Sequence, residues 1–405
     1  VFGSLESAHT QPGKVLFITL GAKGVRIIQG DWTTTIPAVP TQELDPTGAG
    51  DTFCGATLAF LMHNFHPVMA ARRAAALAAE MIAYIGPAAL LFDQQAPKTA
   101  LDPRVAVNDR QVAKVAEVLS NFPEESPFPF AGPEYPPVGH PKTLDVFFAA
   151  TLHQFSFWSV KDGRYDRPMI DTINGKQRKG SDYLWAAFQR QLAHDPEMLF
   201  PSRQANFDRD QLLALFRSDC GNDPMPALDL HLDMANRYGR DMLALQRTPQ
   251  SILQNSLDSS EPLKSFIAAL DQIGGYKEDP LRKKSSLLLL ILNQRPEKFF
   301  PLREDERVAP VIDYHLMRSL LRVGLIEVTD DELLEKLSER QIISSDQEWA
   351  VRYTAYMAMQ QVVDQSGKSQ GVVDYFFFNA RKRCPEMSQP ECQSCQIDPV
   401  CAHRK

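Results

Sequence analysis

Apolar residues along the chain follow two patterns, which predict two kinds of structure. Two short apolar runs separated by a glycine-containing turn predict a β-hairpin, and two longer segments with apolar side chains at helical spacing predict helices. The predicted strands are residues 15–20 and 25–29, and the predicted helices are residues 49–64 and 67–85. Together these elements predict an α/β fold for residues 1–96.

The composition changes after this first part. A short helical pattern at residues 109–121 leads into residues 122–141, which contain seven prolines. Proline fixes the backbone and removes a hydrogen-bond donor, so a stretch this rich in proline is typical of a semi-rigid connector. We therefore predict a linker at residues 97–141.

Beyond the linker the helical period is almost continuous, and no repeat is evident. The predicted helices are residues 143–157, 183–193, 209–217, 227–243, 251–255, 262–273, 283–293, 311–323, 330–340, 347–365 and 371–383. This pattern predicts an all-α domain at residues 142–383, followed by a tail at residues 384–405.

The chain has 405 residues and a formal net charge of −7, which argues against a protein that coats nucleic acid non-specifically. The longest apolar run, residues 287–292, is too short to cross a bilayer, and no signal peptide is evident. Of six cysteines, Cys54 and Cys220 are isolated and four crowd the tail, which indicates metal ligation in a reducing cytosol. We expect a cytoplasmic protein that makes no membrane contact.

Candidate chemistry first appears at Gly48, Ala49, Gly50 and Asp51. The three small residues run into a helix, so their backbone N–H groups form an anion site at its N-terminus, where Asp51 can act as a base. The alternative is a glycine-rich cap with an acid that favours the helix dipole. The sequence DPTGAGDTF at residues 45–53 resembles the C-terminal signature of the ribokinase-like (PfkB) sugar and nucleoside kinases.

This resemblance implies a kinase that uses ATP and Mg²⁺. It implies that Gly48 to Gly50 hold the developing phosphoryl charge and that Asp51 activates the acceptor hydroxyl. Thr19, Gly21 and Gly24 resemble the family segment that approaches the nucleotide, although a glycine pair alone is only a turn. Because the chain begins with material of the second half of such a domain, we expect it to be a fragment.

Four short motifs occur in the second part: FSFW at residues 155–158, RSD at 217–219, IDYHL at 312–316 and DYFFF at 374–378. Their order and spacing resemble the queuosine salvage proteins, over about residues 142–383. The resemblance implies a queuosine 5′-phosphate N-glycosylase with a helical fold similar to the helix-hairpin-helix DNA glycosylases. It also implies a queuosine-type nucleoside or nucleotide as the substrate.

Several residues in these motifs have a catalytic and a structural interpretation. Asp313 matches the family's catalytic position, where a carboxylate stabilises a cationic sugar, but it can also simply be the acid at a helix start. Phe157 and Trp158 can stack on a flat base or belong to the core. Asp219 can accept hydrogen bonds from a base or form a salt-bridged cap.

Three further residues are candidates for binding the substrate. Tyr314 and His315 flank Asp313 and can touch phosphate or sugar, although His315 can equally be a packed histidine. Lys284 follows residues 272–282, which resemble the hairpin of the DNA glycosylases, and can bind a single nucleotide phosphate. Two alternatives remain for this segment, namely a grip on the backbone of duplex DNA, as in those glycosylases, and a solvated helix start at Lys283 and Lys284.

The tail carries Cys384, Cys392, Cys395 and Cys401 with intervals of seven, two and five residues. Four thiolates this close indicate a metal site. The arrangement resembles the iron–sulfur loop of the endonuclease III group, whose first interval is one residue shorter, and this implies a structural [4Fe–4S] cluster. Zinc on the same four sulfurs is the alternative.

The leading hypothesis is a fused salvage enzyme, in which a kinase makes a nucleoside 5′-phosphate and a glycosylase releases its base. The second is an iron–sulfur DNA repair glycosylase with a vestigial kinase segment, which the acidic net charge disfavours. The third is a non-catalytic nucleotide-binding scaffold, against which the intact motifs around Asp51 and Asp313 argue.

Overall fold

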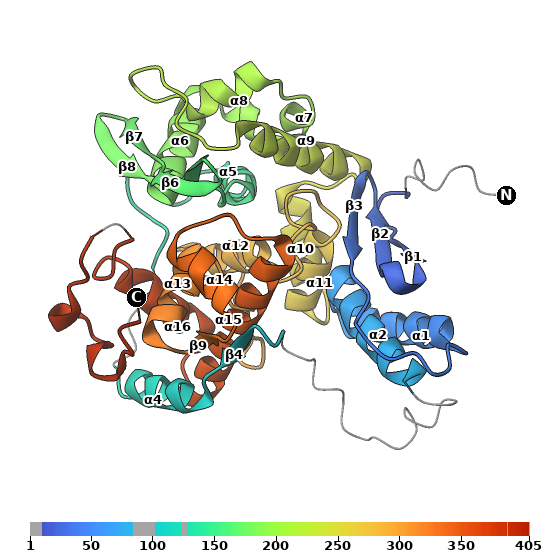
Figure 1. The fold of residues 1–405 in the computed structure, drawn as a ribbon. Coiled ribbons are helices and arrows are strands. Elements are labelled where there is room, and N and C mark those ends of the chain that lie inside the picture. The colour runs from blue at the N-terminus through green and yellow to red at the C-terminus, as the bar shows by residue number, and fades with distance from the viewer. Residues whose placement is uncertain (1–9, 84–101, 123–127, 387, 405) are drawn as a thin grey trace.

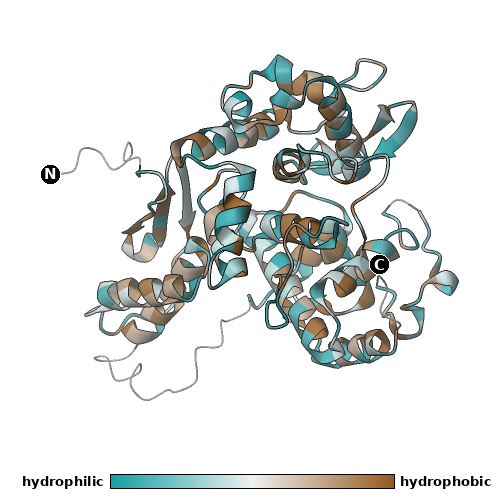
Figure 2. Cartoon of the chain, turned by 180° about the vertical axis from the view of Figure 1, so that it is seen from behind, coloured by the Kyte–Doolittle hydropathy of each residue, from teal (hydrophilic) through white to brown (hydrophobic). Residues whose placement is uncertain are grey.

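The computed structural model describes residues 10–83, 102–122, 128–386 and 388–404. Over these residues the chain is mostly helical, with four small antiparallel sheets (Figure 1). Figure 2 shows apolar residues in brown and polar residues in teal on different sides of the same helices, the pattern from which the helices were predicted. None of the described helices is both long and apolar enough to cross a membrane.

The N-terminal part (residues 10–83) contains strands and helices, as predicted. Its strands pair in the order β1-β2-β3, and helices α1 and α2 pack against the sheet through a small apolar core that includes Ile27, Phe53 and Ala74. The third strand was not predicted. The elements are β1 (Leu16–Thr19), β2 (Val25–Gln29), β3 (Trp32–Ile36), α1 (Ala49–Met62) and α2 (Pro67–Ile82).

Part of the segment predicted as a linker is packed into the helical part (residues 102–404). Strand β4 (Val105–Val107) pairs with β9 (Ile326–Val328), and helix α4 (Asp109–Ser120) packs on α15 (Ser345–Ser366). Gln111 on α4 donates a hydrogen bond to the Val323 carbonyl at 2.8 Å. The residues before the proline-rich stretch therefore lie against elements more than 200 positions later in the chain.

The helical part has two hydrophobic cores. The first is formed around α5 to α12, and the second joins α4 and β4 to α13 to α16 and the tail. The remaining helices are α5 (Thr143–Leu152), α6 (Gly180–His194), α7 (Pro201–Gln204), α8 (Arg209–Phe216), α9 (Leu228–Ala244), α10 (Pro249–Leu257), α11 (Pro262–Leu270), α12 (Lys283–Gln294), α13 (Tyr314–Val323), α14 (Asp331–Ser338) and α16 (Gln370–Ala380).

The prediction that this part is all-α is wrong, because two β-hairpins follow α5. Their strands are β5 (Trp158–Lys161), β6 (Arg164–Pro168), β7 (Ile170–Ile173) and β8 (Lys176–Lys179). The turns are Asp162-Gly163 and Asn174-Gly175, in which both residues have positive φ, between 50° and 73°. Asx-Gly pairs between short strands are a strong hairpin signal, since both central residues of the turn need positive φ.

The tail is anchored to the second core. It contains two short 3-10 turns, Cys392–Ser394 and Asp398–Val400, of which the second contacts α4, and Ile397 between them is buried in the second core. The backbone N–H of Ala402 donates to Val323 at 3.1 Å, and that of Arg404 donates to Arg322 at 3.0 Å. The cysteine-rich tail is therefore a packed part of the domain.

Candidate functional site

A cavity of about 1590 Å³ lies where the elements of the two cores meet. Ligand pockets of roughly 300–1,000 Å³ hold small molecules, so this space is large enough for a nucleotide. No residue of the N-terminal part lines it. Charged and aromatic residues that line it include Phe155, Trp158, Glu278, Asp279, Lys283, Lys284, Asp313, Tyr314, Arg352 and Asp374.

Asp313 is the N-cap of α13. Its Oδ1 accepts a hydrogen bond from the Leu316 N–H at 2.9 Å, which satisfies a donor at the helix start, and its Oδ2 is not used by this cap. The helix was predicted to begin at residue 311 but begins at Tyr314. The structural interpretation of Asp313 therefore holds, and the same side chain also lines the cavity.

A second carboxyl group lies near Asp313, on α16. Burial, together with the negative charge of Asp313, raises the pKa of Asp374 well above its usual value. The Oδ1 atom of Asp374 is shielded from solvent and has no hydrogen-bond partner among the described residues. Burial first, and the nearby Asp313 carboxylate second, thus favour the protonated form of Asp374.

Two lysines stand at the start of α12. The ammonium group of Lys283 donates to the Gln154 carbonyl, and that of Lys284 lies 4.5 Å from the centre of the Phe155 ring. Burial lowers the pKa of Lys283 although Asp313 opposes this effect. Burial also lowers the pKa of Lys284, to about 8, although the Glu278 carboxylate partly compensates. These cations are poorly solvated, which favours an anionic ligand beside them.

Asp279 and Arg352 hold the start of α12 in place. The Arg352 guanidinium donates to Asp279 at 2.7 Å, and the same carboxylate oxygen accepts from the Lys283 N–H at 2.9 Å. Burial alone would raise the pKa of Asp279, but the charge and hydrogen bond of Arg352 lower it to about 2. This ion pair is therefore maintained across the neutral pH range.

The predicted aromatic residues are also at the cavity. Trp158 is half-buried in its wall, whereas Phe157 is 8% exposed and lies against Gly180. The rings of Tyr314 and His315 lie 3.9 Å apart. The structure thus brings Phe157, Trp158, Tyr314 and His315 into the wall of one cavity.

His315 takes part in a charged cluster. Its Nδ1 lies 3.0 Å from Glu386, which also pairs with Lys179, and its Nε2 lies 3.4 Å from Arg381. Burial raises the pKa of Glu386, but hydrogen bonds from His315 and Lys179 outweigh it and lower the pKa well below its usual value. His315 therefore links the start of α13 to the end of α16 and to the first residues of the tail.

Asp219 lies outside the cavity. Its carboxylate accepts hydrogen bonds from the backbone N–H groups of Asn174 at 3.2 Å and Gly175 at 2.8 Å. It is also 3.8 Å from Arg190. Asp219 thus fixes the turn of the β7–β8 hairpin, an element that the sequence prediction did not include.

The predicted kinase residues lie in the N-terminal part. Gly48 has φ 83° and caps α1, and Asp51 is exposed on the first turn of this helix. The Ala49 N–H donates to the Pro46 carbonyl at 3.2 Å, which leaves the neighbouring N–H groups at the helix start for an anion. Ala49 and Gly50 are the first helical residues. This arrangement fits an anion at the helix N-terminus.

The other predicted ATP neighbours surround the β1–β2 turn. Thr19 and Gly21 are exposed. Gly24 is buried with φ 87°, and a Cβ atom there would lie 2.0 Å from the Ile36 carbonyl oxygen. The close approach of β3 is therefore a sufficient structural reason for glycine at position 24.

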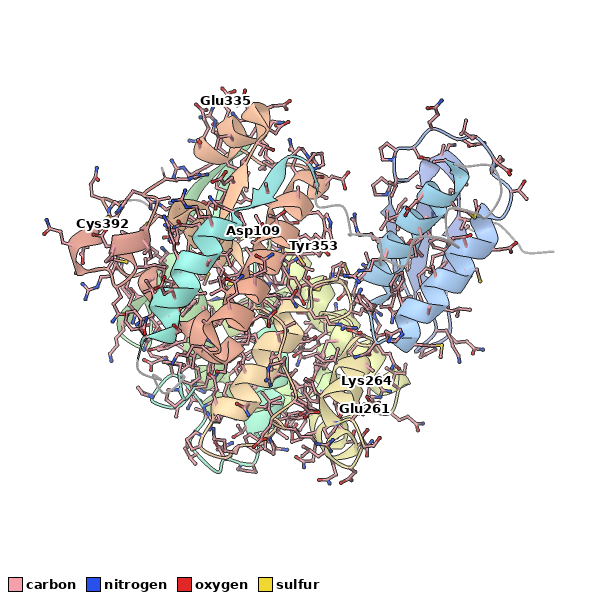
Figure 3. The ribbon with its side chains drawn as sticks, turned by 90° about the horizontal axis from the view of Figure 1, so that it is seen from below. Asp109, Glu261, Lys264, Glu335, Tyr353 and Cys392 are labelled. Carbon is pink, nitrogen blue, oxygen red and sulfur yellow. The ribbon has the colours of Figure 1, made fainter. Side chains whose placement is uncertain are left out.

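The tail holds a possible metal centre. Burial raises the pKa of the Cys395 and Cys401 thiols, and the nearby thiols of Cys384 and Cys392 contribute to both increases. The four predicted ligands are thus near one another. Cys392, labelled in Figure 3, lies on the side of the helical part far from the N-terminal part.

A second donor set overlaps these cysteines. Within the described residues, donor atoms of Cys392, Asp398 and His403 lie within 4.8 Å of one another. A set of four thiols fits zinc or an iron–sulfur cluster, whereas a mixed sulfur, oxygen and nitrogen set fits zinc better. The donors present therefore suit a metal without identifying it.

Sequence reasoning missed the roles of Glu278, Asp279, Arg352 and Asp374. Asp374 had a signal, since it begins the DYFFF motif at residues 374–378. The pairing of Asp279 with Arg352 had none, because the two residues are 73 positions apart.

Two protein families match separate segments of the chain. Residues 3–93 match the pfkB family carbohydrate kinases, and residues 135–289 match the queuosine salvage proteins. Asp313 lies outside the second match, whereas Trp158 and Lys284 lie within it. No curated protein gives a significant match. The chain therefore combines a PfkB kinase family segment, residues 3–93, with a queuosine salvage protein domain, residues 135–289.

Proposed function

We propose that the helical part hydrolyses the N-glycosidic bond of queuosine 5′-phosphate or a similar nucleotide and releases the free base. The observation that carries this proposal is that one cavity contains both the Asp313–Asp374 carboxyl pair and two desolvated lysines. A carboxylate suits a cationic sugar, and lysines suit a phosphate. The match to the queuosine salvage proteins supports this type of substrate.

In the proposed reaction, the bond between the sugar C1′ atom and the base nitrogen breaks, and its electron pair leaves with the base. The Asp313 carboxylate stabilises the positive charge that develops on the sugar and accepts a proton from the water that adds to C1′. The departing base takes up a proton, and we assign its delivery to Asp374, because its raised pKa favours the protonated form. The products are the base and ribose 5-phosphate.

The cavity walls provide the binding interactions for this reaction. Lys283 and Lys284 bind the 5′-phosphate, which replaces the water that burial removes from their ammonium groups. Trp158 offers a flat surface on which a base can stack. Phe155 is already stacked on His231 and carries the Lys284 ammonium over its ring, so it supports that lysine instead. Tyr314, next to Asp313, contacts the sugar. A phosphate held in this way orients C1′ toward the carboxylate.

The PfkB segment belongs, in this proposal, to a kinase that makes the 5′-phosphate. PfkB kinases use ATP and Mg²⁺, which supply the phosphoryl group and neutralise its charge. The N–H groups at Gly48 to Gly50 would stabilise the phosphoryl group, and Asp51 would take the proton of the acceptor hydroxyl. A glycosylase that requires a 5′-phosphate benefits from a kinase in the same protein.

The four cysteines of the tail hold a metal centre, for which we propose a [4Fe–4S] cluster. The tail packs on α4 and α13, and Gln111 donates hydrogen bonds to both Val323 and Val400. Such a centre would fix the C-terminal end of α13, the helix whose N-terminal end Asp313 caps. Its role is structural.

A comparison of substrates tests the glycosylase proposal. Released base is measured by chromatography after incubation with queuosine 5′-phosphate, with queuosine and with damaged duplex DNA. We expect release from the nucleotide to be much faster than from the nucleoside, because the phosphate contributes binding energy. Release from duplex DNA alone, with strong salt dependence, would instead indicate a DNA glycosylase. Release from none of the three would refute the proposal.

A further inference from the structure

The PfkB segment packs directly against the loop that leads to the lysines of the cavity. This loop, the α11–α12 connection (residues 271–282), joins α11 to α12. Figure 1 shows α2 of the PfkB segment beside α11. The two family segments therefore meet at one of the elements from which the candidate glycosylase site is built.

Three hydrogen bonds join the PfkB segment to this connection. The Gln29 side chain donates to the Asp271 carbonyl at 2.8 Å, and the His66 Nε2 atom lies 2.7 Å from the Lys277 carbonyl oxygen. The Arg282 guanidinium donates to the Asn64 carbonyl at 2.8 Å. The contacts fall at the beginning, the middle and the end of the connection. The PfkB segment thus holds the loop along its length, through two of its backbone carbonyls and one of its side chains.

Apolar and cation–π contacts surround these hydrogen bonds. Met69 of α2 packs with Leu281 and Tyr353, the latter labelled in Figure 3. The Arg72 guanidinium lies 4.4 Å from the centre of the Trp349 ring. Desolvated contacts of this kind stabilise an interface more than exposed ion pairs do. The interface therefore has an apolar centre in addition to its polar contacts.

The other side of the same connection faces the cavity. Gly275, Glu278 and Asp279 line the cavity, and the connection continues into Lys283 and Lys284. Asp279 accepts a hydrogen bond from the Lys283 N–H. Among the neighbouring carboxylates, Glu278 has the largest effect on the pKa of Lys284. A shift of the connection would therefore move the ammonium groups relative to Asp313.

We infer that the PfkB segment positions the phosphate-binding lysines of the glycosylase site by holding the α11–α12 connection, independently of any phosphoryl transfer of its own. Gln29 and His66 are positioning residues, since they act on the substrate only through this loop. The inference rests on the proposed function in one respect, namely that Lys283 and Lys284 bind the 5′-phosphate.

The test compares variants of the whole chain in two assays. His66→Ala and Gln29→Leu each remove one hydrogen bond to the connection, and Gln29→Leu keeps most of the side-chain volume. His63→Ala is the matched control, because His63 is exposed only three residues before His66. One assay measures KM and kcat for queuosine 5′-phosphate and for queuosine, and the other measures ribose 5-phosphate binding by calorimetry.

We expect both interface variants to raise KM for the nucleotide, and to weaken ribose 5-phosphate binding, on the order of tenfold, because small displacements of a positioning group have effects of this size or larger. Cleavage of the bare nucleoside and the control variant should be unchanged. Unchanged binding in both interface variants, or equal losses for nucleotide and nucleoside, would overturn the inference.

The calorimetric assay separates the two proposals. If the unmodified chain binds ribose 5-phosphate and the variants weaken this binding, but no substrate releases base, the glycosylase proposal fails and the positioning role stands. If the unmodified chain releases base and both variants behave like the control, the positioning role fails and the glycosylase proposal stands. An unmodified chain that binds no ribose 5-phosphate overturns the positioning role.

Discussion

Replacing Lys284 with methionine should make the protein more stable and less active. Burial lowers the pKa of Lys284 from 10.5 to about 8, so its ammonium form is less favourable in the folded chain than in water. At about 1.4 kcal/mol for each pKa unit, the charged form destabilises the fold by about 3 kcal/mol at neutral pH. Methionine has a similar length and can pack against Phe155, 4.5 Å from the present ammonium group.

The same pKa gives the sign of the pH dependence. Between pH 8 and 10.5 the unfolded chain still binds a proton at Lys284 that the folded chain has released. The contribution of this residue to the free energy of unfolding therefore rises with pH in that window. Phosphate binding changes in the opposite direction, because only the ammonium form pairs with the phosphate. KM for the nucleotide should rise above about pH 8.

The loss of function in Lys284→Met should be large. A charge-assisted hydrogen bond contributes about 1.5–3 kcal/mol, so KM for queuosine 5′-phosphate should increase roughly tenfold to a hundredfold. The nucleoside should be cleaved as before. Lys284→Arg should restore phosphate binding and reduce the alkaline rise in KM, because a guanidinium stays charged throughout this pH range.

The assays are urea unfolding at several pH values and steady-state base release, with Lys176→Met on the exposed strand β8 as the control. A misfolded variant would lose both stability and activity. Greater stability together with a higher KM would therefore show that the lost activity comes from the missing ammonium group. A lower stability of Lys284→Met would refute the argument from burial. An unchanged KM would refute the assigned contact with phosphate.

Three further predictions concern the other candidate sites. Asp313→Asn should slow base release by orders of magnitude with little change in melting temperature, since asparagine is as good an N-cap as aspartate; normal release would remove its catalytic role. Anaerobically purified protein should be brown and contain about four irons per chain, and stoichiometric zinc without visible absorption would overturn the cluster but keep the metal site. In a protein with a complete kinase domain, Asp51→Asn should abolish phosphorylation with the fold intact, as measured by ADP release, and near-normal rates would contradict its role as base.

Local sequence signals predicted most of the helices, because amphipathic periodicity and capping residues are local properties. Predicted helix 109–121 corresponds to α4, Asp109–Ser120, which Asn108 caps through the Gln111 N–H. The missed hairpins also had a local signal, the Asx-Gly turns after Lys161 and Ile173. The predicted helices leave residues 158–182 without an assigned element, because strands such as β6 and β8 are short and polar and show no apolar alternation.

The parts that the sequence could not predict depend on contacts between distant residues. The pairing of β4 with β9 joins residues more than 200 positions apart, and neither three-residue strand has a pattern of its own. For Asp219 the local motif left two interpretations open, an acceptor for a base and a salt-bridged cap. Its actual partners, Asn174 and Gly175, lie in a hairpin that must be known first.

The start of α12 gives the strongest physical reason to expect an anionic ligand in the cavity. Helix N-termini carry partial positive charge and favour acids, yet α12 begins with Lys283 and Lys284 after Arg282 as its N-cap. No acid occupies its first turn. Asp279 compensates part of this charge but is already paired with Arg352.

The start of α13 has the opposite character. There Asp313 caps the helix in the favourable sense, and burial raises the pKa of its neighbour Asp374, which favours the neutral form. The acid at the start of α13 is therefore the residue that helix stability favours, whereas the lysines at the start of α12 oppose it. A ligand with a negative group for α12 and a developing positive charge for Asp313 would satisfy both. A nucleoside 5′-phosphate that is losing its base has these two features.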